Sequence, residues 1–129
     1  MEQKTVSAIV PVFNEEKTVA KVIEALLGSG LVSEIVCVND DSSDQSLKIL
    51  QSFGGRIKLI DLKKNYGKGF AVVSGIKCSR GELLLFCDAD LINFTSDHVR
   101  SMLKPVLEGD YKAVFAVPTQ DLRGRYARS

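Results

Sequence analysis

Apolar and polar positions follow a regular pattern along the chain, with short apolar runs separated by longer segments of helical spacing. Five runs have the length and composition of strands: Val6–Val12, Glu34–Val38, Arg56–Leu62, Glu82–Cys87 and Lys112–Val117. Continuous apolar runs bounded by turn residues are typical of strands that are buried on both faces of a sheet. The run over 56–62 alternates apolar and polar residues, which indicates a strand nearer the sheet edge.

The segments between these runs predict four helices. The first ends at Gly28, and Asn14 is expected to cap it, so that two glutamates fall in its first turn. The second is expected to be capped within the run SSD that follows the second strand. A third helix covers residues 69–79, where small residues permit close packing. A fourth begins near Asp97, and Pro105 predicts a kink in it.

This alternation of strand and helix predicts an α/β fold with a mostly parallel sheet and helices on both faces. One domain is expected over residues 1–117, followed by a polar tail over 118–129 for which disorder is one expectation. A polar cluster follows each of the first four strands: NEE, NDDSSD, KKNYGKG and DAD. In such sheets, ligands bind at the carboxyl ends of the strands. The four clusters should therefore meet at that edge.

The cluster DAD places Asp88 and Asp90 directly after an apolar strand. Two neighbouring carboxylates repel each other, so that one binds a proton unless a cation compensates. Oxygen ligands suit Mg²⁺ or Mn²⁺, which keep several waters and take phosphate oxygens as further ligands. The alternative is an ordinary turn with aspartate caps, and the position after a buried strand favours the metal.

Two other clusters suggest contacts with a nucleotide. NYGKG places Lys68 between two glycines at a predicted helix start, where the backbone can approach an anion. Its spacing is that of neither a P-loop nor a GxGxxG motif, and a left-handed turn before a helix is the alternative. In NDDSSD, the serines and the last aspartate suit a helix cap. Asp40 is not needed for that cap, so it is a candidate for contact with a ribose or base edge.

Charge is balanced overall but segregated along the chain. The formal net charge is +1 over 129 residues, which gives no overall basic field for nucleic acid or anionic membrane. Residues 34–44 nevertheless carry four acids and no base, and residues 63–80 carry five bases and no acid. This pairing fits a ligand that combines anionic groups with a cation.

Cysteine and histidine add little to the candidate chemistry. The three cysteines, Cys37, Cys78 and Cys87, lack metal or disulfide spacing and favour a reducing cytoplasm. Cys87 is expected in the core rather than as a nucleophile, because nothing beside it would lower its pKa. His98, the single histidine, is expected at an exposed helix position rather than as a ligand.

Four motifs together resemble a known enzyme family. VPVFNEE, VNDDSSD, NYGKGFAVVSGI and GELLLFCDADL match, in order and spacing, the nucleotide-sugar-binding half of family 2 glycosyltransferases with the GT-A fold. The chain is similar in this respect to dolichyl-phosphate mannose or glucose synthases and to glucosyl-3-phosphoglycerate synthases. The resemblance runs from about Val6 to Val117. No single motif is specific, but four in the right order are.

The resemblance implies transfer of a hexosyl group from a UDP- or GDP-linked sugar, with Mg²⁺ or Mn²⁺ as cofactor. It implies these site residues: Pro11, Phe13 and Glu15 at the base and ribose, Asp40 at the base edge, Lys68 near the phosphates, and Asp88 and Asp90 at the metal. Asp90 would bind the metal that bridges the phosphates, and Asp88 would face the ribose or the metal's water shell. The acceptor, a sugar, phosphoglycerate or polyprenyl phosphate, and the catalytic residue stay unassigned.

Two features depart from the family pattern. The first is the run Asn39-Asp40-Asp41-Ser42, which stands where the family has D-D-G-S. Asp41 can replace the glycine because aspartate tolerates a left-handed backbone. Asn39, in contrast, leaves the role of the first family aspartate unfilled. Family enzymes also continue well beyond the fifth strand with an acceptor site and a base. We therefore expect a chain truncated there, which binds donor but transfers sugar poorly by itself. Self-association as a homo-oligomer would cover an exposed edge, and peripheral attachment to a membrane is the alternative to a purely cytoplasmic location.

Three other readings of the motifs are weaker. The same fold could hold a nucleotide sugar without transferring it, as a binding module. A nucleotidyltransferase-like protein would open with a glycine-rich basic loop, which VPVFNEE is not. An NAD- or ATP-binding Rossmann protein needs glycines after the first strand, and FNEE has none.

Overall fold

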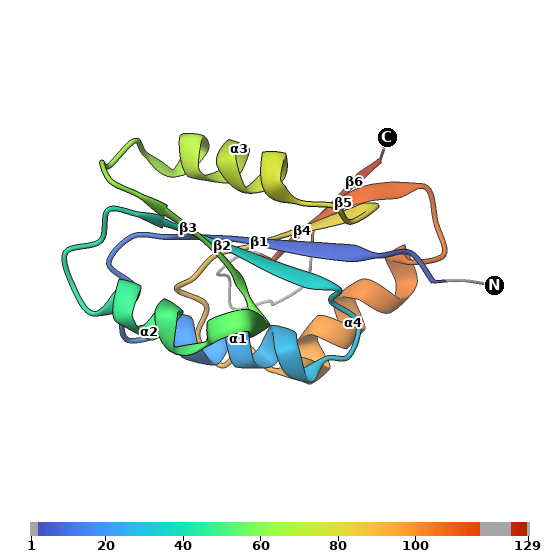
Figure 1. The fold of residues 1–129 in the computed structure, drawn as a ribbon. Coiled ribbons are helices and arrows are strands. Elements are labelled where there is room, and N and C mark those ends of the chain that lie inside the picture. The colour runs from blue at the N-terminus through green and yellow to red at the C-terminus, as the bar shows by residue number, and fades with distance from the viewer. Residues whose placement is uncertain (1–2, 117–124, 129) are drawn as a thin grey trace.

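The computed structural model describes residues 3–116 and 125–128, which form an α/β fold (Figure 1). The strands are β1 (Val6–Val12), β2 (Glu34–Asp40), β3 (Lys58–Leu62), β4 (Leu83–Cys87), β5 (Tyr111–Ala116) and β6 (Arg125–Arg128). The helices are α1 (Val19–Gly28), α2 (Ser46–Ser52), α3 (Lys68–Cys78) and α4 (Ser96–Val106), with a 3-10 turn, η1 (Gly54–Arg56), before β3.

The strands form one sheet in the order β3-β2-β1-β4-β5-β6. The pairs from β3 to β5 are parallel, which confirms the predicted parallel sheet. β6 pairs with β5 in the antiparallel direction and was not predicted from the polar sequence. The predicted domain boundary at 117 and most of the predicted polar tail lie outside the described residues.

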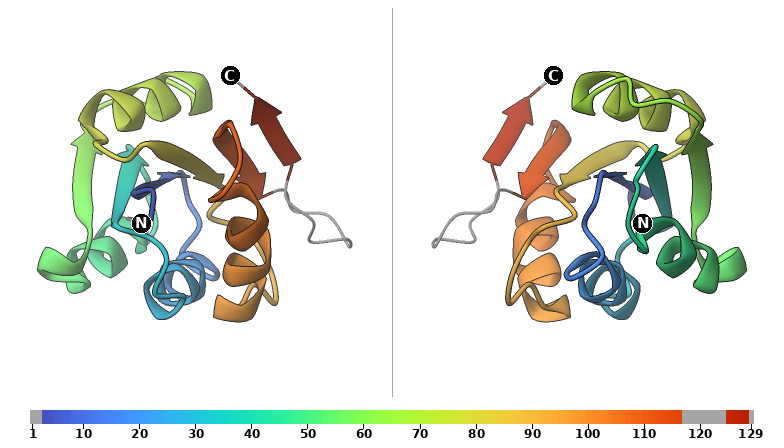
Figure 2. Two further views of the ribbon diagram at one scale, coloured as in Figure 1. Left: turned by 90° about the vertical axis from the view of Figure 1, so that its right-hand side faces the viewer. Right: turned by 90° about the vertical axis from the view of Figure 1, so that its left-hand side faces the viewer.

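Helices cover both faces of the sheet, as predicted. Among the described helices, α1, α2 and α4 lie on one face and α3 lies alone on the other (Figures 1 and 2). The residues of α3 that pack on β1 and β2 are small: Ala71 and Gly75 are buried. A Cβ added at Gly75 would lie 2.7 Å from Cγ2 of Ile9, so only glycine permits this close approach. No helix in the described part of the chain is long and apolar enough to span a membrane.

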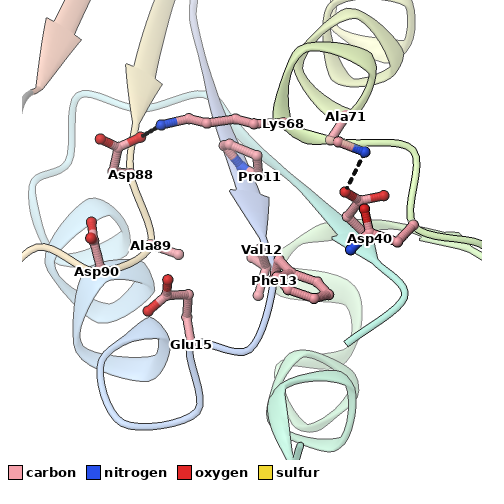
Figure 3. A pocket seen from close by; sticks show the side chains of 12 residues that line it. Pro11, Val12, Phe13, Glu15, Asp40, Lys68, Ala71, Asp88, Ala89 and Asp90 are labelled. Atoms are coloured by element: carbon pink, nitrogen blue, oxygen red, sulfur yellow. Dashed lines mark hydrogen bonds and ion pairs between the residues drawn. The ribbon is translucent and has the colours of Figure 1, made fainter. Parts of the chain in front are cut away.

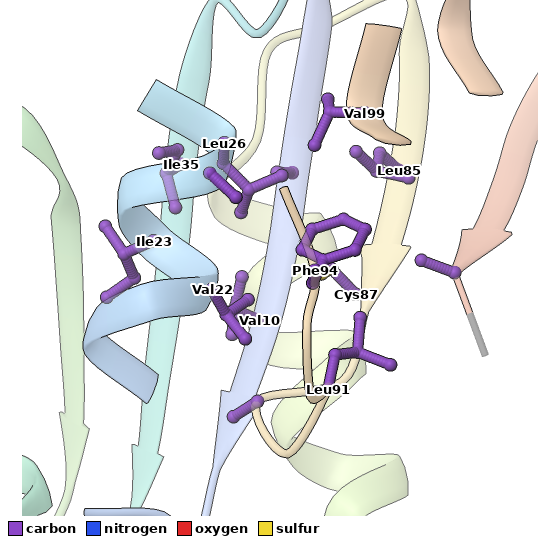
Figure 4. Close-up of a cluster of buried hydrophobic side chains, with 14 of the residues drawn as sticks. Val10, Val22, Ile23, Leu26, Ile35, Leu85, Cys87, Leu91, Phe94 and Val99 are labelled. Atoms are coloured by element: carbon purple, nitrogen blue, oxygen red, sulfur yellow. The ribbon is translucent and has the colours of Figure 1, made fainter. Parts of the chain in front are cut away.

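The main core lies between the sheet and the α1–α4 layer. Its members come from β1, β2, β4, α1, α4 and the loop after β4 (Figure 4), and they include Val10, Val22, Leu26, Leu85, Phe94 and Val99. Cys87 belongs to this core as predicted, and burial raises the pKa of its thiol. Burial also raises the pKa of the Cys37 thiol to about 12. Neither thiol therefore ionises near neutral pH.

The predicted cap of the first helix was wrong, because the polar side chain of Asn14 cross-links two loops instead of capping α1. α1 begins at Val19 with Thr18 as its N-cap, and Asn14 instead adopts a left-handed backbone with φ of 53°. The side-chain oxygen of Asn14 accepts a hydrogen bond from the backbone N–H of Ser43 at 2.8 Å. His98 is half-buried, not exposed, because it forms a capping box with Thr95 at the start of α4. Pro105 lies in the last turn of that helix.

Candidate functional site

A cavity of about 420 Å³ opens at the carboxyl ends of β1, β2 and β4, beside the start of α3 (Figure 3). Its lining residues are Pro11, Val12, Phe13, Glu15, Asp40, Asn65, Gly67, Lys68, Ala71, Asp88, Ala89 and Asp90. All of the site residues predicted from the sequence are in this set. The structure therefore brings the four polar clusters together at one edge of the sheet, as the parallel topology requires.

Loop-to-loop hydrogen bonds hold the segment after β1 in place. The backbone N–H of Asn14 donates to the Ser42 hydroxyl at 3.0 Å, and that of Glu15 donates to the Ser46 hydroxyl at 2.9 Å. These contacts join the loop after β1 to the loop after β2 and to the first residue of α2. In the same segment, Phe13 is 45% exposed at the cavity. An exposed aromatic ring at a cavity wall is a ready stacking surface for a planar ligand group.

Asp40 fixes the loop that leads into α3. It is 3% exposed, and its two carboxylate oxygens accept hydrogen bonds from the backbone N–H groups of Tyr66 and Gly67 at 2.8 and 2.9 Å. The next residue, Asp41, has φ of 58°, so aspartate does occupy the left-handed position that the family usually fills with glycine. The structure thus gives Asp40 a scaffolding contact that the sequence did not reveal.

Asn39 is buried and bonds to a residue that sequence reasoning did not select. Its amide nitrogen donates to Oδ1 of Asp61 at 2.9 Å. Hydrogen bonds from Lys63 and Asn39 hold the pKa of Asp61 below its usual value. An aspartate at position 39 would face this carboxylate and repel it. The pairing therefore explains why an amide suits position 39. The only sequence signal for Asp61 was the alternation of the third strand, which places polar residues on one face.

Lys68 spans the cavity toward Asp88 (Figure 3). Its ammonium nitrogen lies 2.5 Å from Oδ1 of Asp88. This ion pair joins the lysine predicted at the phosphates to one of the two aspartates predicted at the metal. The loop that carries the two aspartates is held by Thr18, whose hydroxyl donates to the Ala89 carbonyl at 2.7 Å. The Thr18 bond thereby fixes the DAD loop on the side of the cavity opposite the start of α3.

Asp90 and Glu15 give the other end of the cavity a negative field. The exposed carboxylate of Asp90 makes no hydrogen bond or ion pair with a side chain in the described part of the chain. Burial, followed by the nearby Asp90, Asp44 and Asp88, raises the pKa of Glu15. Accumulated carboxylate charge of this kind is what a cation would relieve.

The donor set fits a divalent cation that is only partly held by protein. Among residues 3–116, no group of three carboxylate, histidine or cysteine side chains is close enough to form a complete metal site. Mg²⁺ and Mn²⁺ commonly bind through one or two carboxylates, with waters and ligand phosphates as the remaining ligands. Asp90, with Asp88 beside it, could supply such a pair.

A second, more apolar cavity of about 300 Å³ adjoins the first. It shares Pro11, Lys68 and Asp88 with the first cavity and is otherwise lined mainly by apolar side chains, which include Phe86 and Phe115. These two rings are stacked with centroids 4.9 Å apart, and Phe86 packs against the small cluster of buried residues that includes Ala71 of α3. The charged end of the first cavity therefore continues into an apolar one.

Known proteins with similar sequences are glycosyltransferases. The sequence profile of Glycosyl transferase family 2 matches residues 7–128. An undecaprenyl-phosphate 4-deoxy-4-formamido-L-arabinose transferase of Pseudomonas aeruginosa is 38% identical over 96 residues, which cover 68% of this chain and 28% of that protein. A glucosyl-3-phosphoglycerate synthase of Mycolicibacterium paratuberculosis is 32% identical over 114 residues, which cover 83% of this chain and 35% of that protein. The chain thus spans about a third of these relatives.

Solved structures agree with this assignment. Glucosyl-3-phosphoglycerate synthase from Mycobacterium tuberculosis, in complex with Mn²⁺, UDP and glucosyl-3-phosphoglycerate, superposes with a TM-score of 0.71 at 26% identity, over 83% of this chain and 41% of that one. TarS of S. aureus, in complex with UDP-GlcNAc, gives a TM-score of 0.60 at 31% identity, over 67% of this chain and 26% of that one. With its parallel sheet, its GT-A neighbours and a profile match over nearly its whole length, the chain belongs to glycosyl transferase family 2.

Proposed function

We propose that this chain is the donor-binding part of a glycosyltransferase, which holds a nucleoside-diphosphate sugar in the first cavity together with a divalent cation. The observation that carries the proposal is the convergence in one cavity of an exposed aromatic ring, a lysine at a helix start and two aspartates at a strand end. Each of these groups suits a different part of such a donor. A planar base, a diphosphate and a cation are the ligand groups that they can bind.

The residues of the cavity divide between the two ends of the donor. Phe13 and Pro11 would contact the base and ribose, with Asp40 near the base edge through the oxygen lone pairs that the loop amides leave free. Lys68 would leave Asp88 and bind the diphosphate. Asp90 and Asp88 would hold Mg²⁺ or Mn²⁺, which supplies Lewis-acid stabilisation of the leaving diphosphate.

Uridine is the base that the comparisons support best. The related M. tuberculosis structures are complexes with UDP and Mn²⁺ or Mg²⁺, and the S. aureus structure is a complex with UDP-GlcNAc. For the acceptor, relatives are named for undecaprenyl phosphate and for phosphoglycerate. The apolar second cavity beside Lys68 favours the lipid-linked phosphate, because phosphoglycerate has no apolar part to bury.

The test is ligand binding measured separately from turnover. Thermal unfolding with UDP, GDP and UDP-sugars, with Mn²⁺ or with EDTA, should show a stabilisation by UDP that is larger with the metal, since a ligand that binds only the folded state raises the midpoint. Unchanged midpoints with every nucleotide would refute the proposal.

A binding module without transferase activity is the second candidate. One observation favours it. The acidic side chains that line the first cavity all lie on loops or strand ends that are assigned to the donor, so none of them is left as a base for the acceptor. UDP release from UDP-sugars, with and without polyprenyl phosphate or phosphoglycerate, separates the two. We expect metal-dependent binding and slow release that acceptors barely stimulate, because a general base must lie within hydrogen-bond reach of the acceptor. Strong acceptor stimulation would assign full transferase activity to the chain.

A further inference from the structure

Helix α3 exposes its large apolar side chains to solvent and packs on the sheet through small residues. The buried residues of α3 are Ala71 and Gly75, whereas Phe70 and Val73 are 49% and 50% exposed. A surface helix normally buries its large apolar residues and exposes polar ones. Close packing of α3 needs the small residues, but nothing in the packing requires large apolar residues outside.

The exposed apolar residues form one continuous surface. Phe70, Val73 and Lys77 are spaced i, i+3 and i+7, so they lie on one face of the helix. Tyr66 extends this face, because its ring stacks on Phe70 with centroids 4.4 Å apart. Lys64 lies over the Tyr66 ring, with its ammonium 6.0 Å from the centroid. We call Lys64, Tyr66, Phe70, Val73, Ile76 and Lys77 the α3 outer surface.

This surface is positively charged as well as apolar. The segment 63–80 holds five bases and no acid. Two of the bases are neutralised, since Lys63 pairs with Asp61 and Lys68 pairs with Asp88. No acid of the described residues forms an ion pair with Lys64, Lys77 or Arg80. The free charge on and beside the α3 outer surface is therefore positive.

The combination selects among the partners that could cover the surface. A second copy docked face to face would bring Lys64 and Lys77 close to the same lysines of its neighbour, which costs energy in a dry interface. Aromatic and aliphatic side chains that are flanked by lysines match an anionic lipid bilayer, whose interface accepts rings at the headgroup level and attracts bases. Charge complementarity therefore points to a lipid surface rather than to self-association.

We propose that the α3 outer surface is a docking site for an anionic lipid bilayer. Tyr66, Phe70 and Val73 would enter the headgroup region, and Lys64 and Lys77 would contact lipid phosphates. Lys68, the first residue of α3, also lines the first cavity, so docking would bring the cavity mouth close to the headgroups. The proposal uses residues outside that cavity and does not depend on the donor or acceptor assignment.

Co-sedimentation with vesicles tests the proposal, with phosphatidylglycerol–phosphatidylcholine mixtures compared with pure phosphatidylcholine. We expect binding to the anionic vesicles that weakens as salt rises. Replacing both lysines, Lys64→Gln with Lys77→Gln, should lower the partition coefficient about 25-fold, at about fivefold for each lysine. Phe70→Ser with Val73→Ser should lower it about tenfold or more, because half of each side chain is free to be buried.

Matched controls lie away from this surface. The control for the apolar pair is Ile92→Ser, at a side chain that is 70% exposed. The control for the lysine pair is Lys21→Gln on α1 with Lys48→Gln on α2, at two exposed lysines. These variants should bind vesicles like the unchanged protein. UDP affinity, measured without vesicles, should be the same in every variant, which separates this proposal from the proposed function.

Three results would overturn the proposal. One is equal binding to neutral and anionic vesicles, and another is equal binding by the α3 and control variants. The third is a concentration-dependent dimer, abolished by the Phe70→Ser and Val73→Ser pair, in a protein that ignores vesicles; this would assign the surface to a second copy. The lysine variants change only exposed side chains, so they keep the test valid even where an apolar variant folds poorly.

Discussion

The substitution Asp40→Asn separates two roles that the site allows for this residue. Asp40 is almost completely buried, and its two oxygens accept N–H groups from Tyr66 and Gly67. Asparagine has the same shape but a single acceptor oxygen. One loop N–H would then face the amide NH₂ group, donor against donor, and the loop that leads to Lys68 would lose part of its restraint.

The expected loss of stability follows from these contacts. A hydrogen bond to a charged group contributes about 1.5–3 kcal/mol, and burial leaves no water to replace the one that is lost. The free energy of unfolding should therefore fall by about 1.5–3 kcal/mol. For a chain of this size, about 3–5 °C of melting temperature corresponds to 1 kcal/mol, so the midpoint should fall by roughly 5–15 °C.

The assay is thermal unfolding followed by circular dichroism, without nucleotide. Asp41→Asn is the matched control, because it removes the same charge one residue away at a φ of 58° that asparagine also tolerates. A midpoint for Asp40→Asn within about 2 °C of that control would refute the scaffolding role. If stability were unchanged while UDP affinity fell, the contact of Asp40 would instead be with the base alone.

Three further predictions concern the charged groups. Asp90→Ala should abolish the Mn²⁺-dependent part of UDP binding in calorimetry without lowering the melting temperature. The control, Glu24→Ala at an exposed position of α1, should leave UDP binding and melting temperature unchanged. An Asp90→Ala variant that keeps the full metal dependence would exclude Asp90 as the metal ligand. Lys68→Ala should weaken UDP more than uridine by about 1.5–3 kcal/mol, and an equal loss on both ligands would place Lys68 away from the diphosphate. Burial acts to raise the pKa of Glu34, but hydrogen bonds from Ser7 and the Arg80 N–H, together with Lys58, hold this pKa below its usual value. A carboxylate whose pKa is lowered in the folded state stabilises the fold at pH values above its unfolded pKa, and this stabilisation is lost as the pH falls through the folded pKa. Glu34→Gln should therefore lower the melting temperature at pH 7, and the difference from the unchanged protein should vanish in acid. A difference in melting temperature that is constant with pH would contradict this.

The sheet could be predicted from sequence because its strands carry their own signal. Val6–Val12 and Leu83–Cys87 are apolar on both faces, and only a parallel sheet with helices on both sides buries such strands. β6 has no such pattern. It is defined by backbone pairing with β5, which depends on the neighbouring strand and not on its own apolar residues. Edge strands of this kind escape any method based on hydrophobic periodicity.

The site could be predicted as a set of residues but not as a set of contacts. Strand ends of a parallel sheet meet at one edge, so the four clusters had to converge. Which side chain meets which is decided by loop conformation. Asn14 looked like a helix cap because a capping residue and a loop cross-link have the same polar composition. Asn39 likewise could be interpreted only once the third strand had brought Asp61 beside it.

The ion pair between Lys68 and Asp88 explains why the two binding-site variants should fail in different ways. The side chain of Lys68 is 65% exposed, and an exposed pair of this kind is worth about 0–1 kcal/mol, so a diphosphate can displace Asp88 at little cost. Asp88 then needs another cation, and Asp90 has no counter-ion of its own among the described residues. A divalent ion and a diphosphate together satisfy all three groups, whereas either one alone leaves a charge unmatched. Loss of Asp90 should therefore remove only the binding that depends on metal. Loss of Lys68 should weaken the diphosphate in both conditions, because that contact exists whether or not the metal is present.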